Sequence, residues 1–326
     1  MNDFYVTEQA DSQAIPLIPL RQDEFESWKA SASAAQRRWV EASGFNAAAS
    51  QFCTLPGPDG SLQSGLFGLA EQGWLYQLAP LVASLPCQTY RLQCDWTREQ
   101  RLQASLGWGL ASYRFDRYKA NDTPRAALQL AADIDADVRS FCEAQFLVRN
   151  LVNTPTEHLG PAQLADAATR EADLFEAASA SITGPDLLTH NFPAIHAVGR
   201  ASASQPRLVE LDWGEEDLPL LTLVGKGVCF DSGGLDMKSS SGMALMKKDM
   251  GGGAHALALA RLVMQHRLPV RLKLLIPAVE NSVSGNAYRP GDVIATRKGL
   301  TVEIGNTDAE GRVVLADALA YACEQQ

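Results

Sequence analysis

The chain lacks several patterns that mark large protein classes. Its six cysteines form no CxxC pair, and their scattered, mostly apolar surroundings indicate reduced structural thiols in a cytosolic setting. No apolar run approaches the ~20 residues needed to span a bilayer. Residues 1–4 show no basic region followed by an apolar run, so a secretory signal has no support. We therefore expect a cytoplasmic protein without a membrane partner.

Common catalytic motifs are also missing. The five histidines form no HExxH or other ligand pair, which argues against a zincin site, and no GxSxG elbow supports serine hydrolase chemistry. The Gly225-Lys226-Gly227 segment is not a P-loop, because Leu220 stands where that motif needs glycine and no Ser or Thr follows the lysine.

Positive charge is scarce. The chain has 28 Lys and Arg against 38 Asp and Glu, a net charge of −10 and a pI of about 5.0. Only isolated basic pairs occur, such as Arg37-Arg38 and Lys247-Lys248. This charge distribution disfavours a nucleic-acid surface that depends on phosphate contacts. The 46% hydrophobic and 20% charged content over 326 residues is ordinary for a globular protein with room for two cores.

The chain divides into three predicted parts. Residues 1–122 indicate a small α/β domain, with candidate strands at 64–69 and 89–92. Residues 123–157 predict a connecting helix, with Thr123 as a cap, Pro124 in the first helical position and Asn153-Thr154-Pro155 at the end. Residues 158–326 form the second, larger domain.

The second domain alternates helices with β-rich runs. Residues 218–224 form a short apolar run closed by Gly225, as expected of a buried strand, and 270–276 predict another. A helix begins at Gly251, and 293–296 with 301–304 flank a turn as a hairpin does. The Ala/Ser-rich stretch 177–181 indicates helix or loop. We expect an α/β fold with a mixed sheet flanked by helices.

Two clusters of charged residues carry the chemistry. Asp308 and Glu310 are two apart, so on an extended segment they point the same way and repel unless a cation lies between them. Upstream lie Lys226, Asp231, Lys238 and Asp249. The four carboxylates carry about four negative charges, which two divalent ions would balance. The set has no histidine or cysteine, so it tolerates Mn²⁺ or Mg²⁺ as well as Zn²⁺. Together the clusters predict a two-metal hydrolytic site.

These segments resemble the leucyl (cytosol) aminopeptidase family of dinuclear metallo-enzymes. The heptapeptide 306–312, Asn-Thr-Asp-Ala-Glu-Gly-Arg, matches that family's signature without a substitution, and the spacing from Lys226 to Asp308 fits its pattern. Further matches are residues 112–118 and 150–155. The resemblance is firm from about residue 107 to the end.

The resemblance implies a role for each site residue. Asp231 and Glu310 would bridge both metals, Asp308 would hold the exchangeable metal, and Lys226 and Asp249 would complete the tighter site. Because a lysine must be neutral to ligate, Lys226 needs a lowered pKa.

The remaining roles are also implied by the resemblance. Lys238 would stabilise the oxyanion and Arg312 would hold a bicarbonate that relays protons. Met246 and Asn306 would line the substrate pocket. The implied cofactors are two divalent ions (Zn or Mn, with Mg or Co as alternatives) and bicarbonate.

The resemblance further implies a homohexamer that releases apolar N-terminal residues from peptides. The alternative is a non-catalytic, oligomeric or DNA-binding regulatory member of the family. Because family members continue well past residue 326, we expect the C-terminal part of the catalytic domain to be missing, and these 326 residues alone to bind metal weakly and turn over peptides poorly.

Overall fold

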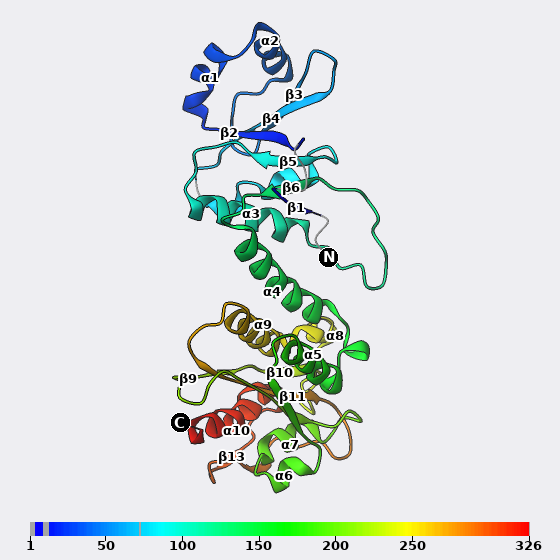
Figure 1. Cartoon of the computed structure of the whole chain (residues 1–326). Helices are drawn as coiled ribbons and strands as arrows, with labels where there is room; N and C mark the ends of the chain where they lie inside the picture. The colour runs from blue at the N-terminus through cyan, green and yellow to red at the C-terminus, as the bar shows by residue number, and fades with distance from the viewer. Residues whose placement is uncertain (1–3, 9–12, 72, 326) are drawn as a thin grey trace. The chain divides into compact units, whose positions relative to one another are not determined.

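The structure is a computed structural model that describes residues 4–8, 13–71 and 73–325 (Figure 1). The expectation of no secretory signal concerned residues 1–4, and residues 1–3 lie outside the described residues. The chain separates into two compact units, Met1–Glu143 and Ala144–Gln326, and each is described by itself. Among the described residues, no helix is both long and apolar enough to cross a membrane.

Unit 1 contains a six-stranded sheet in the order β1-β6-β5-β2-β4-β3. All neighbouring strands are parallel except β3, which is antiparallel to β4. The strands are β1 Tyr5–Thr7, β2 Ile15–Leu20, β3 Phe52–Pro56, β4 Leu62–Gly68, β5 Thr89–Leu92 and β6 Ala127–Leu130. The helices are α1 Phe25–Ser31, α2 Ala34–Ser43 and α3 Arg98–Ser112, with short 3-10 turns η1 Gln22–Glu24, η2 Trp74–Tyr76 and η3 Ala79–Ala83.

The start of the connecting helix was predicted wrongly. Residues 127–130 form β6, which pairs with β1 and β5, and α4 spans Asp135–Asn153. A short apolar run such as Ala127–Leu130 fits a strand and a helix equally well, and here the parallel ladders on both sides decide it. The helix ends at Asn153, as predicted. The division between units falls inside α4, and the domain boundaries at 122 and 157 stay a prediction.

Unit 2 contains a mixed five-stranded sheet and a hairpin, which confirms the predicted fold class. The sheet strands are β7 Ala178–Thr183, β8 Arg207–Trp213, β9 Leu220–Val224, β10 Gly227–Asp231 and β11 Arg271–Asn281. The antiparallel hairpin is β12 Val293–Ala295 with β13 Thr301–Glu303. The helices are α5 Pro161–Leu174, α6 Asp186–Thr189, α7 Pro193–Gly199, α8 Ser240–Met243, α9 Gly251–Gln265 and α10 Glu310–Glu324, with 3-10 turns η4 Thr156–His158, η5 Met246–Lys248 and η6 Thr307–Ala309.

The Ala/Ser-rich stretch was also predicted wrongly. Residues 178–183 form β7, which pairs antiparallel with β8 over its whole length. Its small side chains are mostly exposed and carry little periodicity, so the hydrogen-bonded partner strand, rather than local preference, fixes this edge strand.

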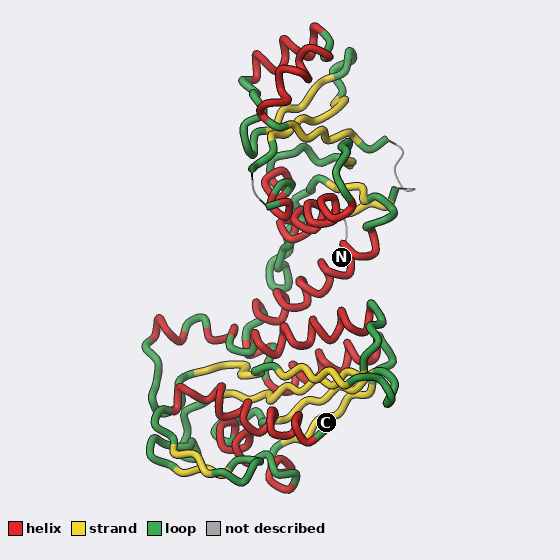
Figure 2. The backbone as a smooth tube through the Cα atoms, turned by 90° about the vertical axis from the view of Figure 1, so that its left-hand side faces the viewer, coloured by secondary structure: helices red, strands yellow, loops and turns green. Residues whose placement is uncertain are grey.

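The central strand β11 separates two hydrophobic cores. Leu272, Leu274 and Ile276 pack with side chains of α4, α5 and α9, whereas Leu275 and Val279 pack with side chains of α7 and α10. This alternation follows from the two-residue period of a strand. Figure 2 shows helices on both sides of the strands of this unit. Because helices cover both faces of the sheet, polar residues gather at the carboxyl ends of β10 and β11.

Strands β9 and β10 follow one another along the same edge of β11, and the chain bends between them at Gly225-Lys226. A Cβ on Gly225 would lie 2.6 Å from the carbonyl oxygen of Gly252, so only glycine allows α9 to approach this closely. The amide of Gly253 donates to the carbonyl of Lys226 at 2.7 Å. The start of α9 therefore fixes the backbone of Lys226 at the break.

Candidate metal centre

The site begins where two parallel strands end side by side. Asp231, the last residue of β10, is paired in register with Asn281, the last residue of β11. Its Oδ1 accepts hydrogen bonds from Asn281 Nδ2 and from the amide of Gly233, both at 2.8 Å. Asp231 is 2% exposed. These two donors satisfy one carboxylate oxygen and hold the other in a fixed direction.

Thr307 fixes the loop that carries the other carboxylates. Its side chain is fully buried, and its hydroxyl donates to the carbonyl of Gly233 at 2.6 Å. Its own carbonyl accepts from Asn281 Nδ2 at 2.9 Å and from the hydroxyl of Tyr288 at 2.7 Å. Asn281 therefore touches both the strand that bears Asp231 and the loop that leads to Asp308.

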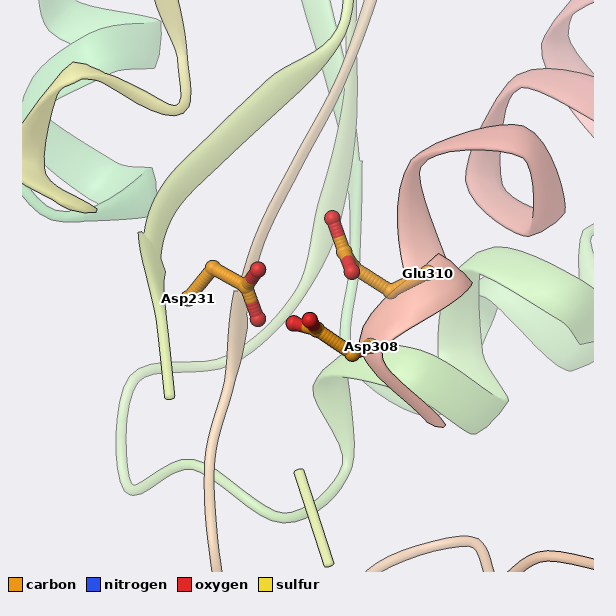
Figure 3. Close-up of side chains that lie close together, drawn as sticks. All are labelled: Asp231, Asp308 and Glu310. Carbon is orange, nitrogen blue, oxygen red and sulfur yellow. The ribbon is translucent and has the colours of Figure 1, made fainter. Parts of the chain in front are cut away.

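Three carboxylates converge at this point. Asp231, Asp308 and Glu310 each offer an oxygen, and these atoms all lie within 4.8 Å of one another. Figure 3 shows the three side chains pointing toward a common centre, from the end of β10 on one side and from the start of α10 on the other. Glu310 is buried, whereas Asp308 is more accessible. The centre is thus open on the side of Asp308.

Lys226 connects Asp249 to this group. Its Nζ lies 2.7 Å from Asp249 Oδ2 and 2.7 Å from Glu310 Oε1. Burial alone would lower the pKa of Lys226, but the hydrogen bonds that it donates to the two carboxylates outweigh burial and raise the pKa above its usual value. Without a metal Lys226 is therefore a protonated ammonium, and it would have to release a proton in order to ligate.

Lys238 provides the second ammonium. Its Nζ lies 2.9 Å from Asp231 Oδ2 and also contacts Asp308 Oδ1. Burial opposes the charge of Lys238, but the two carboxylates raise its pKa well above the usual value. Four carboxylates and two lysines thus leave a net charge of about −2 in the cluster.

The residues present fit hard divalent cations. Oε2 of Glu310 is buried and has no hydrogen-bond partner among the described residues, and burial raises the pKa of this carboxyl group. A buried carboxylate oxygen without a donor is costly, and a cation would satisfy it. The donors are oxygens with one amine, which suits Mn²⁺, Mg²⁺ or Zn²⁺. The three-carboxylate group does not include Asp249, which joins it only through Lys226.

The other three predicted site residues do not touch the carboxylates. Arg312 is exposed on the first turn of α10 and makes no hydrogen bond or ion pair with any described residue. Met246 is half-buried at the start of η5. The Oδ1 of Asn306 accepts from the amide of Asp308 at 2.7 Å, so this side chain caps the turn that presents Asp308.

Sequence reasoning missed three residues that orient the ligands: Asn281, Tyr288 and Thr307. Asn281 carried a signal, because it is a polar residue at the end of a long, mostly apolar strand. Thr307 lies inside the matched heptapeptide, but its role depends on contacts with residues more than 70 positions away. Tyr288 is almost completely buried, and its hydroxyl finds its partner only in the folded chain.

Comparison with known proteins identifies the family. The sequence model described as "Cytosol aminopeptidase family, catalytic domain" matches residues 146–326, and that described as "M17 aminopeptidase, N-terminal domain" matches residues 15–131. The chain belongs to the M17 cytosol aminopeptidase family. The two matches fall largely in units 2 and 1, respectively.

Named relatives agree with this family. Peptidase B of Pectobacterium carotovorum is 43% identical over 236 residues, which are 68% of this chain and 53% of that protein. A probable cytosol aminopeptidase of Xanthomonas axonopodis is 40% identical over 224 residues, which are 65% of this chain and 45% of that protein. The matched region thus spans about half the length of these relatives.

Solved structures agree with the fold. The cytosol aminopeptidase of Coxiella burnetii has a TM-score of 0.96 and 47% identity, and the alignment covers 99% of this chain and 71% of that one. The bottromycin maturation enzyme BotP, solved in complex with Mn, has a TM-score of 0.82 and 33% identity, covering 95% of this chain and 69% of its own.

Proposed function

We propose that this M17 family chain forms part of a metal-dependent aminopeptidase that removes N-terminal residues from peptides. The observation that carries the proposal is the convergence of Asp231, Asp308 and Glu310 around a buried carboxylate oxygen that lacks a protein partner. The names of the relatives and the Mn complex of BotP support it.

Five residues would hold two divalent ions. Asp231 and Glu310 would be shared between both ions, Asp308 would belong to the more accessible one, and Lys226 with Asp249 would complete the other. The greater exposure of Asp308 supports its assignment to the ion that exchanges more readily. When bound, two such ions lower the pKa of a water and polarise the scissile carbonyl. Zn and Mn are the first candidates, with Mg and Co as alternatives.

The remaining residues would act on the substrate. Lys238, whose ammonium reaches the edge of the carboxylate group, would stabilise negative charge that develops on the carbonyl oxygen. Arg312, with an exposed guanidinium near the start of α10, would hold a bicarbonate that accepts a proton from the attacking water. Met246 and Asn306 would line the pocket for an apolar, leucine-like first side chain.

Assembly and location complete the proposal. We expect a homohexamer in the cytoplasm, acting on peptides without nucleic acid or membrane partners. Light scattering of the protein expressed from its complete gene tests the oligomeric state, and a monomeric mass would contradict the proposed hexamer. The alternative is a non-catalytic oligomeric or DNA-binding regulatory member of the same family, and the isolated basic pairs of the sequence do not favour DNA binding.

One experiment separates these functions. The protein from its complete gene is stripped with a chelator, titrated with Mn²⁺ or Zn²⁺, and assayed with leucyl-p-nitroanilide. We expect activity to return with metal and to be absent in Asp231→Ala at every metal concentration. Metal binding without any hydrolysis would contradict the aminopeptidase and favour the regulatory alternative.

A further inference from the structure

Unit 1 contains a crevice that the aminopeptidase site does not use. It has a volume of about 350 Å³ and lies at the carboxyl ends of β2, β4 and β5. The end of β2 and the segments that follow the three strands line it. These residues are Pro19 in β2, Arg21 and Glu24 after β2, Leu69 and Trp74 after β4, and Gln93 to Trp96 with Gln100 after β5. Its size lies at the lower end of the range of small-molecule sites.

The position of this crevice in the sheet is where open α/β sheets bind ligands. β2 and β5 are neighbours, but the chain leaves β2 toward β3 and β4 and leaves β5 toward β6, on the opposite side. The order of strands therefore reverses between β2 and β5. At such a point the connections diverge and leave a gap beyond the carboxyl ends of the strands.

One wall of the crevice is aromatic. The rings of Trp74 and Trp96 lie 4.9 Å apart at an angle of 70°. Trp96 also forms a T-shaped pair with Phe67, which is buried in the core, so the ring of Trp96 is held in place. Both indoles are only half-buried. A partly accessible indole face is a surface on which a flat heterocycle stacks, and the second indole, inclined by 70°, then borders the edge of that heterocycle.

The rest of the lining is mostly polar and slightly acidic. Gln93 is exposed, and its side-chain amide makes no hydrogen bond with any described residue. The lining includes one arginine, Arg21, and two carboxylates, Glu24 and Asp95, so its net charge is −1. This charge disfavours an anionic ligand.

The start of α3 offers no phosphate site either. Thr97 accepts from the amide of Gln100 at 3.3 Å, while Gln100 Oε1 accepts from the amide of Thr97 at 2.9 Å. This capping box already occupies donors that a phosphate would need. Burial raises the pKa of the Cys94 thiol, which disfavours a thiolate metal ligand.

We propose that this crevice binds an uncharged nucleoside, whose base stacks on the face of Trp74 and meets Trp96 at its edge. The polar edge of the base and the ribose hydroxyls then meet the amide of Gln93 and the carboxylate of Asp95, which together offer donors and acceptors. The site is separate from the metal centre, so the proposal does not depend on the aminopeptidase activity.

Isothermal titration of the protein with adenosine, AMP and ribose tests this inference. We expect saturable binding of one adenosine per chain with a Kd below about 1 mM. Ribose alone should not bind, and AMP should bind about two- to fivefold more weakly because its phosphate meets the acidic lining. Absence of saturable adenosine binding, or tighter binding of AMP, would overturn the proposal.

Three variants locate the binding. Trp74→Ala should weaken adenosine binding at least about fivefold through lost stacking. Gln93→Ala, an exposed position whose change leaves the fold intact, should weaken it about two- to tenfold. Trp39→Ala on α2, outside the crevice, is the matched control and should leave the Kd unchanged. Equal affinity of the Gln93 and Trp39 variants would place the nucleoside elsewhere and overturn the assignment.

Discussion

Asp236 and Thr307 hold two ligand-bearing loops together through reciprocal hydrogen bonds. The amide of Asp236 donates to Thr307 Oγ1 at 2.9 Å, and the amide of Thr307 donates to Asp236 Oδ2 at 2.7 Å. Lys238 lies two residues after Asp236, and Asp308 directly follows Thr307. The pair therefore fixes the distance between the loop that carries Lys238 and the loop that carries Asp308.

Removing the carboxylate of Asp236 should loosen the metal centre without unfolding the protein. Asp236→Ala leaves the amide of Thr307 without its acceptor, and we expect metal affinity to fall about 10- to 100-fold, as for other partners that orient ligands. Titration calorimetry with Mn²⁺ measures this. Glu216→Ala, which removes an exposed carboxylate after β8, is the control. Unchanged affinity in Asp236→Ala would show that the loops hold their places without the pair.

Glu310→Gln keeps the shape of the side chain and removes its charge. Because Glu310 lies against Lys226 and close to Asp231 and Asp308, we expect metal content and activity to be lost together. Metal analysis by mass spectrometry after dialysis gives the stoichiometry, with Glu303→Gln on the exposed face of β13 as the control. A variant that retained its full metal content would remove Glu310 from the ligand set.

Lys238→Ala should behave differently. If Lys238 stabilises the oxyanion and does not ligate, the metals stay bound while kcat falls about 10²- to 10³-fold. Comparing metal content and kcat of this variant with those of the exposed-lysine control Lys298→Ala measures both effects. Loss of metal from Lys238→Ala would mean that it is a ligand after all.

Gly225→Ala should destabilise unit 2. The added Cβ would lie 2.6–2.7 Å from atoms of Gly252, Gly253 and Ala256, so α9 must move, at a cost of about 1–3 kcal/mol. Gly285→Ala, where a Cβ meets nothing within 4 Å, should change the free energy of unfolding by less than about 0.5 kcal/mol. Urea denaturation of both variants measures this difference, and equal stabilities would contradict the close approach of α9.

His196 gives unit 2 a specific pH dependence. Burial, with a contribution from Arg200, lowers the pKa of His196 below its usual 6.5. The unfolded chain therefore binds more protons than the folded chain as pH falls below about 6.5, and stability decreases. Replacing His196 by Gln should remove this part of the decrease between pH 7.5 and pH 5, as measured by urea denaturation. The same loss of stability in both proteins would contradict the shift.

Strong local patterns predicted much of the fold. The apolar run that ends at Gly225, the strand that begins near residue 270 and the hairpin around residues 297–300 were recovered, because burial and turn residues agreed at each place. The sequence did not predict β6 and β7, because pairing with the neighbouring strands β5 and β8, rather than the pattern of their own side chains, fixes them as strands.

The candidate site was predictable in part for a similar reason. Charged residues such as Asp231 and Glu310 stand out in a sequence. They converge because Asp231 ends strand β10 and Glu310 begins helix α10. Asn281 and Thr307 do not stand out, since their hydrogen bonds join segments 26 to 74 residues apart. Sequence patterns therefore reveal the candidate metal ligands more readily than the residues that orient them.

The central claim is that Lys226, Asp231, Asp249, Asp308 and Glu310 hold two divalent ions. The most direct measurement is anomalous scattering from crystals of the protein soaked in Mn²⁺. For a two-metal centre we expect two anomalous peaks about 3.5–4 Å apart, both within bonding distance of Asp231 and Glu310. A single peak, or two peaks that do not share these carboxylates, would contradict it.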